Sequence, residues 1–245
     1  MDVLKLVNIN KSFYNELGKI EVIKDVSFSL KSNEIISIVG PSGSGKTTIL
    51  NIISKLINYD FGILEVNGNL GYMFQKDHLL EWRTVIKNIL LGLEINKKIN
   101  EETYIEIDNL LKKYGLLDFK KALPSELSGG MRQRIALIRT LMLKPNILLL
   151  DEPFSSLDYQ TRLTICDDIY EIIKEKKLSA LLVTHDIAEA ISMSNRVIVL
   201  SKRPAVIKNI YEINLCNNEN RTPFKSRTCK EFQIYFNNIW SDLNE

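Results

Sequence analysis

The sequence predicts an α/β fold built on a parallel sheet, and three observations support this prediction. Four short apolar runs, at 34–39, 147–150, 180–183 and 196–200, have the length and composition of buried strands. Predicted helices follow the first and second runs, and a glycine-rich loop comes directly after the first. Strands that alternate with helices form a parallel sheet, and such sheets place their chemistry at the carboxyl ends of the strands.

The residues before the first of these runs are also rich in predicted strands. Apolar or alternating segments at 3–9 and 22–30 are separated by a polar, glycine-containing stretch at 15–19. This pattern indicates a hairpin or two neighbouring strands. After the glycine-rich loop, residues 47–56 are predicted to form a helix.

The middle of the chain, from 82 to 143, has a mainly helical pattern. Residues 88–93 and 103–117 carry apolar side chains at helical spacing. A further helix is predicted to end before Pro145. Its buried face is formed by apolar residues at helical spacing: Met131, Ile135, Ile138 and Met142. A helical region that merely fills space remains an alternative to a functional role.

The rest of the chain is predicted to contain one more clear helix and a polar tail. Residues 161–176 have apolar side chains along one side. From 202 onward the basic residues are diluted by acidic ones, which favours a solvated surface.

Length and composition limit the class of protein. The chain has 245 residues, which predicts one large domain, and it contains 32 Lys and Arg against 30 Asp and Glu. The net charge of +2 argues against a strongly basic nucleic-acid binder. The longest apolar runs are of strand length, so we expect no membrane-spanning helix. We also expect no signal peptide, because no basic region precedes an apolar stretch at the N-terminus.

The cysteines and histidines narrow the chemistry further. Cys166, Cys216 and Cys229 are widely spaced and form no C-x-x-C pair, so they are predicted to be reduced thiols in a cytosolic protein. The sequence contains two histidines, His78 and His185, which excludes a histidine-rich metal site.

The glycine-rich loop matches the pattern G-x-x-x-x-G-K-S/T between a predicted strand and a predicted helix. Glycines let the backbone fold around a triphosphate, and the helix that begins near Gly45 adds its positive end. Lys46 supplies a charge for the β- and γ-phosphates, and the Thr47 hydroxyl is placed to ligate Mg²⁺. The predicted triphosphate site consists of consecutive residues: Gly40, Pro41, Ser42, Gly43, Ser44, Gly45, Lys46, Thr47 and Thr48.

Two adjacent carboxylates, Asp151 and Glu152, directly follow the second predicted core strand. Neighbours at a strand end project differently, so one can reach the metal while the other faces the γ-phosphate. Asp151 suits a water-mediated contact with Mg²⁺, and Glu152 suits a general base that polarises the attacking water. A surface loop that carries two acids is the alternative.

A second glycine-rich helix start lies at Ser128, Gly129 and Gly130. The free backbone N–H groups at such a start form a second anion-binding surface. An ordinary serine N-cap, with glycines that ease the turn, is the alternative interpretation.

The string Leu-Ser-Gly-Gly-Met-Arg-Gln at 127–133 looks like a family signature. With it, the chain resembles the ATP-binding subunits of ATP-binding cassette (ABC) transporters. The resemblance covers residues 3 to about 204, and every motif of the family is intact within it.

Further residues match the family's motifs in the expected order. Phe13 resembles the aromatic residue that stacks on adenine, although Tyr14 is one position away. Gln75 resembles the Q-loop glutamine, Asp158 ends a stretch similar to the D-loop, and His185 resembles the switch histidine.

The resemblance implies a phosphate-loop NTPase cassette that forms a single domain. Its RecA-like parallel-sheet core is expected at about 1–75 and 145–204, and the core begins with N-terminal antiparallel strands. An inserted helical subdomain is expected at about 76–144, and a C-terminal tail at about 205–245.

The resemblance also implies a mechanism. Two subunits associate head to tail, and each ATP is held by the phosphate loop of one subunit and by the Ser128 signature of the other. Glu152 activates water and His185 contacts the γ-phosphate. Mg²⁺ is expected at Thr47, Asp151 and Gln75, and Gln75 also links the nucleotide to the membrane partner.

The expected partners follow from the same resemblance. They are a second copy of the chain, integral-membrane permease subunits and, indirectly, an extracytoplasmic solute-binding protein, with no nucleic acid. The chain is therefore expected at the cytoplasmic face of the cell membrane.

The segment after Gln75 resembles one subgroup of these subunits. The patterns L-x-W-R-T-V and N-x-x-L-G-L within residues 79–93 are usual in the nitrate, sulfonate and taurine importer group. Weaker similarities to this group lie at 151–154, at 201–204 and at 221–222 together with Phe232. Trp82 fits a segment that docks on a partner, and a core aromatic residue at a helix start is the alternative.

Two other functions remain open at this point. One is a cassette ATPase that acts on nucleic acid or ribosomes without a membrane. The other is a different phosphate-loop enzyme, such as a nucleotide kinase or GTPase, although the chain has no N-K-x-D motif.

Overall fold

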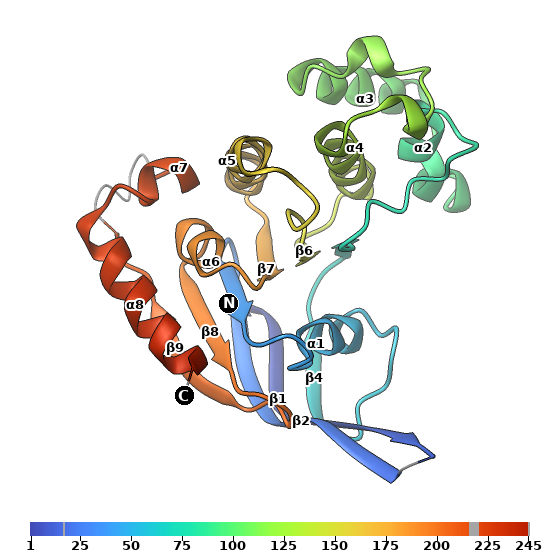
Figure 1. Ribbon diagram of the computed structural model, residues 1–245. Helices are drawn as coiled ribbons and strands as arrows, with labels where there is room; N and C mark the ends of the chain where they lie inside the picture. Colours follow the sequence, from blue (N-terminus) through green and yellow to red (C-terminus); the bar gives the residue numbers. More distant parts are fainter. Residues whose placement is uncertain (17, 216–220, 245) are drawn as a thin grey trace.

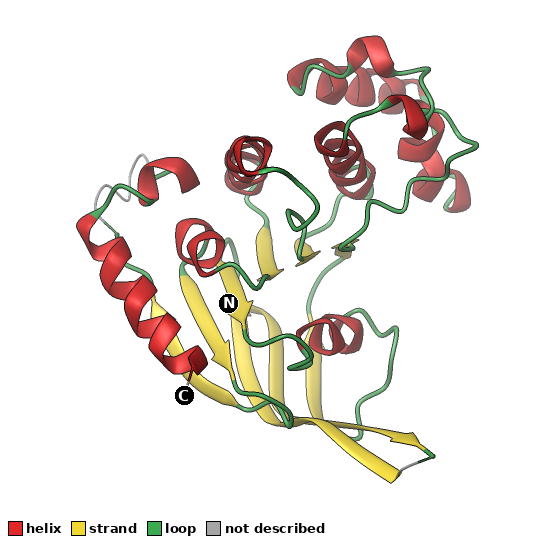
Figure 2. Cartoon of the chain, in the orientation of Figure 1, coloured by secondary structure: helices red, strands yellow, loops and turns green. Residues whose placement is uncertain are grey.

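The computed structural model describes residues 1–16, 18–215 and 221–244. It contains a three-stranded sheet of order β2-β1-β4 and a six-stranded sheet of order β5-β6-β7-β3-β8-β9 (Figures 1 and 2). The strands are β1 (Asp2–Asn15), β2 (Gly18–Lys31), β3 (Ile35–Val39), β4 (Phe61–Val66), β5 (Leu70–Met73), β6 (Ile147–Asp151), β7 (Ser179–Val183), β8 (Arg196–Leu200) and β9 (Ile207–Glu212). The helices are α1 (Lys46–Ile53), α2 (Val85–Ile95), α3 (Glu101–Lys113), α4 (Gly129–Leu141), α5 (Tyr159–Glu175), α6 (Ile187–Met193), α7 (Pro223–Ser226) and α8 (Lys230–Asn244), with 3-10 turns at Leu117–Phe119 and Pro124–Glu126.

The larger sheet has the predicted parallel core. Strands β5, β6, β7, β3 and β8 are parallel, and β9 pairs with β8 in the antiparallel direction. Every residue of β3, β6 and β7 is buried, because helices or the smaller sheet cover both faces. Such burial explains why these strands are continuous apolar runs in the sequence. The four predicted core strands are confirmed to within one residue at each end.

The smaller sheet is antiparallel and begins with the predicted hairpin. Strand β1 pairs with β2 from Asp2–Lys31 to Asn15–Gly18, and with β4 on its other side. Strand β4 was not predicted from the sequence. Its residues are exposed or half-buried, so it lacks the buried apolar face that gives a strand its signal.

The two sheets pack around α1. Apolar side chains of β1, β2, β3 and α1 form one cluster, to which α1 contributes Ile49, Leu50, Ile52 and Ile53. Burying each such side chain contributes about 1.5–3 kcal/mol. The cluster fixes the start of α1, and therefore the loop before it, against the end of β3.

Helices α2, α3 and α4 gather at one end of the molecule, away from the β1–β2 hairpin (Figure 1). Ile135, Ile138 and Met142 are buried as predicted, and Met131 is half-buried against the same cluster. The third predicted helix, 103–117, is wrong at both ends, because α3 begins at Glu101 and ends at Lys113. Gly115 has φ 66°, and such a left-handed residue commonly terminates a helix.

The tail is more regular than predicted. Strand β9 extends the six-stranded sheet, and α8 buries Phe232 and Ile239 in a cluster with α6 and β8. The apolar residues of α8 recur at helical spacing, at Phe232, Phe236, Ile239 and Leu243, so this helix could have been predicted from the sequence. The basic residues for which a solvated surface was predicted are exposed at Arg203, Lys208, Lys225 and Lys230 and half-buried at Arg221 and Arg227, so that prediction is largely confirmed.

The cysteine prediction is confirmed in part. Cys166 is a buried free thiol, but Cys229 is disulfide-bonded, contrary to the prediction. Cys216 lies outside the described residues. Spacing along the chain does not reveal which Cα atoms come within bonding range, so it could not predict this bond. Within the described ranges, no helix is both long and apolar enough to span a bilayer.

Candidate nucleotide-binding and hydrolysis site

A pocket of about 390 Å³ lies at the carboxyl edge of the six-stranded sheet. The loop between β3 and α1 forms one wall, and further residues come from β1, β2, the end of β6 and the loop after β8. The lining residues are Phe13, Val22, Ser42, Gly43, Gly45, Lys46, Thr47, Thr48, Glu152 and Arg203. Gly40, Pro41 and Ser44 belong to the same loop but do not line the pocket.

The loop depends on glycine at two positions. Gly43 and Gly45 have φ of 74° and 97°, in the left-handed region where side chains are strained. A Cβ at Gly45 would also lie 3.0 Å from Cγ1 of Val22. No side chain of the described residues caps α1, so the N–H groups of its first turn point to the loop without a capping partner. Such groups are donors for an anion.

Lys46 is buried with its ammonium group inside the loop. Its Nζ donates to the carbonyl oxygens of Gly40 and Pro41, at 2.8 Å and 2.9 Å. Burial lowers the pKa of Lys46, while the nearby carboxylates of Glu152 and Asp151 oppose that shift. Two backbone carbonyl oxygens therefore hold the Lys46 ammonium group inside the loop.

Asp151 and Thr47 face each other across the end of β6. The Thr47 hydroxyl donates to Oδ1 of Asp151 at 3.1 Å, and the Tyr72 hydroxyl donates to Oδ2 at 3.4 Å. Burial raises the pKa of Asp151, the hydrogen bond from Thr47 lowers it, and the charge of Glu152 raises it further. A neighbouring cation would stabilise the ionised form of this carboxyl.

The donor set fits Mg²⁺ bound together with a phosphate. Thr47 and Asp151 offer a hydroxyl and a carboxylate oxygen, which are ligands that Mg²⁺ prefers. Within the described residues, no group of three or more His, Cys, Asp or Glu side chains could hold a metal alone. Mg²⁺ commonly uses one or two protein ligands plus substrate phosphates, which agrees with both observations.

Glu152, Gln75 and His185 come together from the ends of three adjacent strands, β6, β5 and β7. Oε2 of Glu152 accepts a hydrogen bond from Nε2 of Gln75 at 3.3 Å and lies 3.0 Å from Nδ1 of His185. Its backbone N–H donates to the carbonyl of Val183 at 2.8 Å. Glu152 also has φ 43°, a conformation that costs about 1–3 kcal/mol and is concentrated at functional sites.

Phe13 lines the pocket, whereas Tyr14 does not. The Phe13 ring is 41% exposed, and Nζ of Lys11 lies 5.2 Å from its centroid. An exposed ring at the pocket wall offers a face on which a base can stack. Of the two aromatic residues considered from the sequence, the structure therefore places Phe13 at the pocket.

The signature residues and Asp158 do not line the pocket. Ser128 is the N-cap of α4 and accepts from the N–H of Met131 at 3.3 Å, as the N-cap interpretation predicted. Asp158 caps α5 and accepts from the N–H of Thr161 at 3.0 Å, and these hydrogen bonds lower its pKa. A Cβ at Gly130 would lie 2.7 Å from Cγ2 of Thr161, so glycine permits the close approach of the two helix starts.

Arg203 is a pocket residue that the sequence did not assign to the site. It lines the pocket, and its Nη2 lies 3.6 Å from where a Cβ of Gly43 would be. In the sequence it resembled one basic residue among several in the tail. The signals that could have pointed to it are its position just after β8, at the same carboxyl edge as the phosphate loop, and its place in the 201–204 stretch that resembles the importer group.

The fold and the site together define a phosphate-loop nucleotide-binding α/β protein. A buried parallel strand leads into a glycine-rich loop with a buried lysine, and two carboxylates end the strand two positions away in the sheet. This is the structural context that gives the loop motif its meaning.

Comparison with protein families identifies the class more closely. The ABC transporter family matches residues 23–155, which is more than half of the chain. The chain therefore belongs to the ABC transporter family, and within it to the ATP-binding subunits.

Individual relatives agree with this assignment. The chain is 40% identical to an uncharacterised ABC transporter ATP-binding protein, YtlC of Bacillus subtilis, over 100% of this chain and 96% of the relative. It is 36% identical to the nitrate import ATP-binding protein NrtD of Synechocystis, over 98% of this chain and 94% of the relative. It is also 36% identical to the aliphatic sulfonates import ATP-binding protein SsuB of Bacillus anthracis, over 87% of each chain.

A solved structure agrees with the fold. The dimeric structure of MJ0796, a bacterial ABC transporter cassette, superposes with a TM-score of 0.76 at 30% sequence identity. The match covers 86% of this chain and 99% of that chain. The ABC cassette fold predicted from the sequence is confirmed.

Proposed function

We propose that the chain is the ATP-hydrolysing subunit of an importer for a small anion of the nitrate, sulfonate or taurine kind. The observation that carries the proposal is the convergence of Glu152, Gln75 and His185 beside the phosphate-loop pocket. The similarity to nitrate and sulfonate import subunits supports the solute class.

In this proposal the pocket binds ATP. Lys46, the N–H groups at the start of α1 and the Thr48 hydroxyl hold the phosphates, because they are the donors that line the loop. Phe13 stacks on the adenine. Thr47 and Asp151 would hold Mg²⁺, with Gln75 as a further oxygen ligand, and the bound ion would neutralise charge that develops on the phosphates.

Glu152 is the general base that takes a proton from the attacking water. Its Oε2 is engaged by Gln75 and His185, whereas Oε1 accepts no hydrogen bond from the described residues. The engaged oxygen fixes the orientation of the carboxylate, and the other one remains to accept the proton. His185 is 56% exposed through its side chain, so its free ring nitrogen can turn to the γ-phosphate.

The second half of each ATP site comes from a second copy of the chain. Ser128, Gly129, Gly130 and Asp158 lie outside the pocket of their own subunit, and helix α4 begins with N–H groups that suit an anion. The dimeric arrangement of the similar cassette MJ0796 supports a head-to-tail homodimer. In such a dimer the signature of one subunit closes the phosphate pocket of the other.

The surface around residues 80–84 is the proposed docking site for the permease. Trp82 is 78% exposed, which excludes the alternative of a core aromatic residue. Buried Asn88 fixes this loop, because it accepts from the N–H of Leu80 and donates to the carbonyls of Leu80, Arg83 and Thr84. An apolar ring held on a fixed loop suits a protein partner.

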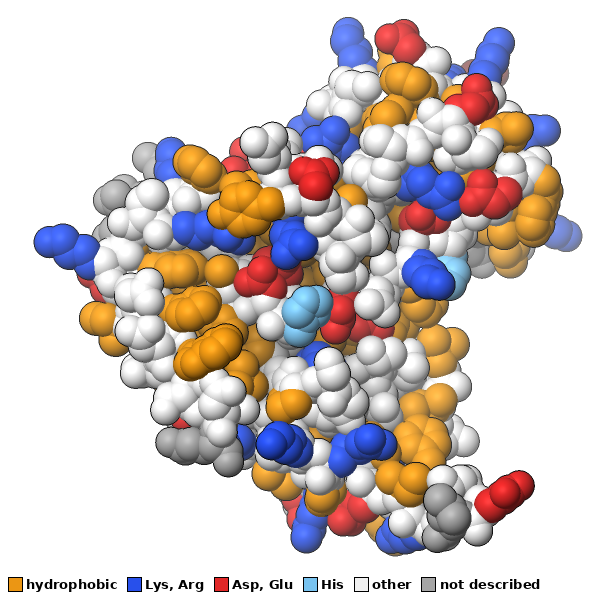
Figure 3. Space-filling model, viewed as in Figure 1, with side chains coloured by type: hydrophobic (Ala, Val, Ile, Leu, Met, Phe, Trp, Pro, Cys, Tyr) orange, Lys and Arg blue, Asp and Glu red, His pale blue; other side chains and the backbone are white. Residues whose placement is uncertain are grey.

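This docking places the chain at the cytoplasmic face of the membrane, with a solute-binding protein acting from the other side. The face drawn in Figure 3 has basic and acidic side chains interspersed over it. Nucleic-acid binding needs a concentrated basic surface, so this face favours a protein partner instead.

The proposal is tested by reconstitution. The chain is purified from native membranes with its permease, placed in vesicles with the solute-binding protein, and its ATPase rate is measured with nitrate, an alkanesulfonate or taurine. We expect one of these anions to stimulate hydrolysis and to be taken up, and the Glu152→Gln complex to do neither. Co-purification with ribosomes or nucleic acid in place of a permease would refute the proposal and support the non-transport alternative.

A further inference from the structure

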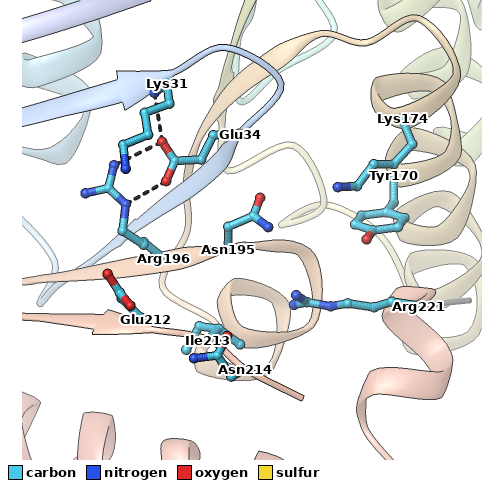
Figure 4. A pocket seen from close by; sticks show the side chains of 10 residues that line it. All are labelled: Lys31, Glu34, Tyr170, Lys174, Asn195, Arg196, Glu212, Ile213, Asn214 and Arg221. Atoms are coloured by element: carbon cyan, nitrogen blue, oxygen red, sulfur yellow. Dashed lines mark hydrogen bonds and ion pairs between the residues drawn. The ribbon is translucent and has the colours of Figure 1, made fainter. Parts of the chain in front are cut away.

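A second pocket, of about 370 Å³, lies at the amino edge of the six-stranded sheet (Figure 4). It lies opposite the phosphate loop, because Glu34 and Asn195 in its wall directly precede β3 and β8. The ends of β2 and β9, helix α5 and Arg221, two residues before α7, complete it. None of its residues has a part in the proposed ATP site.

The pocket contains more positive than negative charge. Both acidic side chains are associated with Arg196. Glu34 forms a bidentate ion pair with it, at 2.6 Å and 3.0 Å, and Glu212 lies opposite Arg196 in the strand register, so both charges raise the pKa of Arg196. Lys174 and Arg221 therefore have no carboxylate partner among the described residues.

Arg221 is a fixed cation with donors to spare. Its Nη2 donates to the carbonyls of Ile191, Ser192 and Ser194 at 2.7, 3.2 and 2.8 Å, and its Nε donates to Ser226 at 3.2 Å. All of these partners are neutral, and Arg221 forms no ion pair with the described residues. Nη1 makes no hydrogen bond with the described residues, and Figure 4 shows the guanidinium group directed into the pocket.

Three further donors lie around this guanidinium group. Lys174 lies over the Tyr170 ring, with Nζ 5.4 Å from the centroid, and burial and the charge of Arg221 lower its pKa. The Tyr170 hydroxyl donates to none of the described residues, so it can donate to a ligand. Oδ1 of Asn195 accepts from the N–H of Ile35 at 2.9 Å, which turns its Nδ2 donor toward Tyr170 and Arg221 (Figure 4).

We propose that Lys174, Tyr170, Asn195 and Arg221 form a binding site for a small oxyanion. The four side chains supply two positive charges and hydrogen-bond donors, and neither cation forms an ion pair with the described residues. An anion with several oxygen atoms satisfies such a set, because charge-assisted hydrogen bonds are stronger than neutral ones. It also relieves the repulsion between Lys174 and Arg221.

A small oxyanion that fits this site could come from two sources. Inorganic phosphate is the product of ATP hydrolysis, and nitrate or a sulfonate is the imported solute. The second source alone rests on the proposed function. If phosphate binds and the other anions do not, the ligand of the site is the product of ATP hydrolysis. If nitrate or a sulfonate binds, the ligand is the imported solute.

The test is calorimetric titration of the full chain, without nucleotide, with phosphate, nitrate and taurine at constant ionic strength. The phosphate loop also attracts phosphate, so each titration is repeated with Lys46→Ala. We expect binding that persists in Lys46→Ala, falls about tenfold or more in Lys174→Gln, and falls severalfold in Tyr170→Phe. Lys176→Gln, a change two residues further along the chain that lies outside the pocket, should bind as the unchanged protein does.

Two results would overturn the site. One is that none of the three anions binds, and the other is binding that is lost in Lys46→Ala but intact in Lys174→Gln. Circular dichroism of each variant shows whether the fold is retained. Tyr170→Phe removes one hydroxyl only, so it keeps the test decisive if Lys174→Gln is unstable.

Discussion

The phosphate-loop pocket and the amino-edge pocket lie at opposite edges of one sheet and are built in opposite ways. In the first, a single loop supplies consecutive backbone donors, and two carboxylates stand beside the lysine. In the second, side chains from separate segments supply the donors, and the cations Lys174 and Arg221 lack carboxylate partners within the described residues. The first suits a ligand that reacts in the presence of a metal ion, and the second suits an anion that only binds.

Helix α6 connects the two edges. Asp186 caps its start, directly after His185, and accepts from the N–H groups of Ala188 and Glu189. The carbonyls of its last turn are held by Arg221 of the amino-edge pocket. Changes confined to one pocket should therefore leave the other intact, whereas a change within α6 can affect both.

The largest expected effect comes from Glu152→Gln. Loss of a general base typically slows a reaction by about 10²–10⁴-fold, so hydrolysis should nearly stop while ATP binding is kept. Sizing chromatography should show an ATP-bound dimer that accumulates. The matched change at the other pocket is Glu212→Gln, which should hydrolyse ATP at the unchanged rate. A Glu152→Gln enzyme with the unchanged rate would show that Glu152 is not the base.

Lys46→Ala should have the next largest effect, on binding itself. Removing the charge that we propose to contact two phosphates should weaken ATP binding by about 10²-fold, measured by titration with a fluorescent ATP analogue. Lys174→Ala removes the same charge from the amino-edge pocket and should leave ATP affinity unchanged. Equal losses in the two variants would mean that net charge, and not the phosphate loop, determines nucleotide affinity.

The sequence predicted the phosphate-loop pocket well for a physical reason. A backbone cradle requires particular residues at consecutive positions, so Gly43, Gly45 and Lys46 are visible as one string. Buried parallel strands are likewise continuous apolar runs. Asp151 and His185 follow such runs, so their common edge could be predicted as well.

The remaining features depend on contacts between distant segments, which no local pattern records. Arg203 reaches the pocket only because β8 ends beside β3. The amino-edge pocket brings Tyr170 and Asn195 together with Arg221, which comes from the tail predicted to be solvated. Strand β4 has too few buried residues to show a clear period, whereas the apolar residues of α8 recur at helical spacing and could have predicted that helix.

Glu189→Gln tests the helix between the pockets. Burial raises the pKa of Glu189 from 4.5 to about 7, against the hydrogen bond from Thr184 at 2.7 Å. Asp186, Arg162, His185 and Cys166 are the other titratable groups that face it. The folded state binds more protons than the unfolded state between pH 4.5 and about 7, so stability should fall as pH rises through this window.

The shift corresponds to a loss of at most about 3 kcal/mol, which the glutamine variant should not show. Urea unfolding of both proteins at pH 5 and pH 8 measures the difference, and Glu171→Gln on the exposed side of α5 is the control. Identical pH profiles for the wild type and Glu189→Gln would contradict the raised pKa.

Arg203→Ala should have the smallest effect. It tests how Arg203 of the phosphate-loop pocket differs from Arg221 of the amino-edge pocket. Nη2 of Arg221 donates to three backbone carbonyls. The Arg203 side chain, in contrast, makes no hydrogen bond or ion pair with the described residues. Its contribution should therefore appear only with nucleotide bound, as a loss of ATP affinity of about tenfold or less. The free energy of unfolding should change by less than about 0.5 kcal/mol, as at other exposed sites. The neighbouring Lys202→Ala, outside the pocket, should change neither the ATP affinity nor the free energy of unfolding. An Arg203→Ala protein with unchanged ATP affinity would show that Arg203 is only a surface residue near the loop.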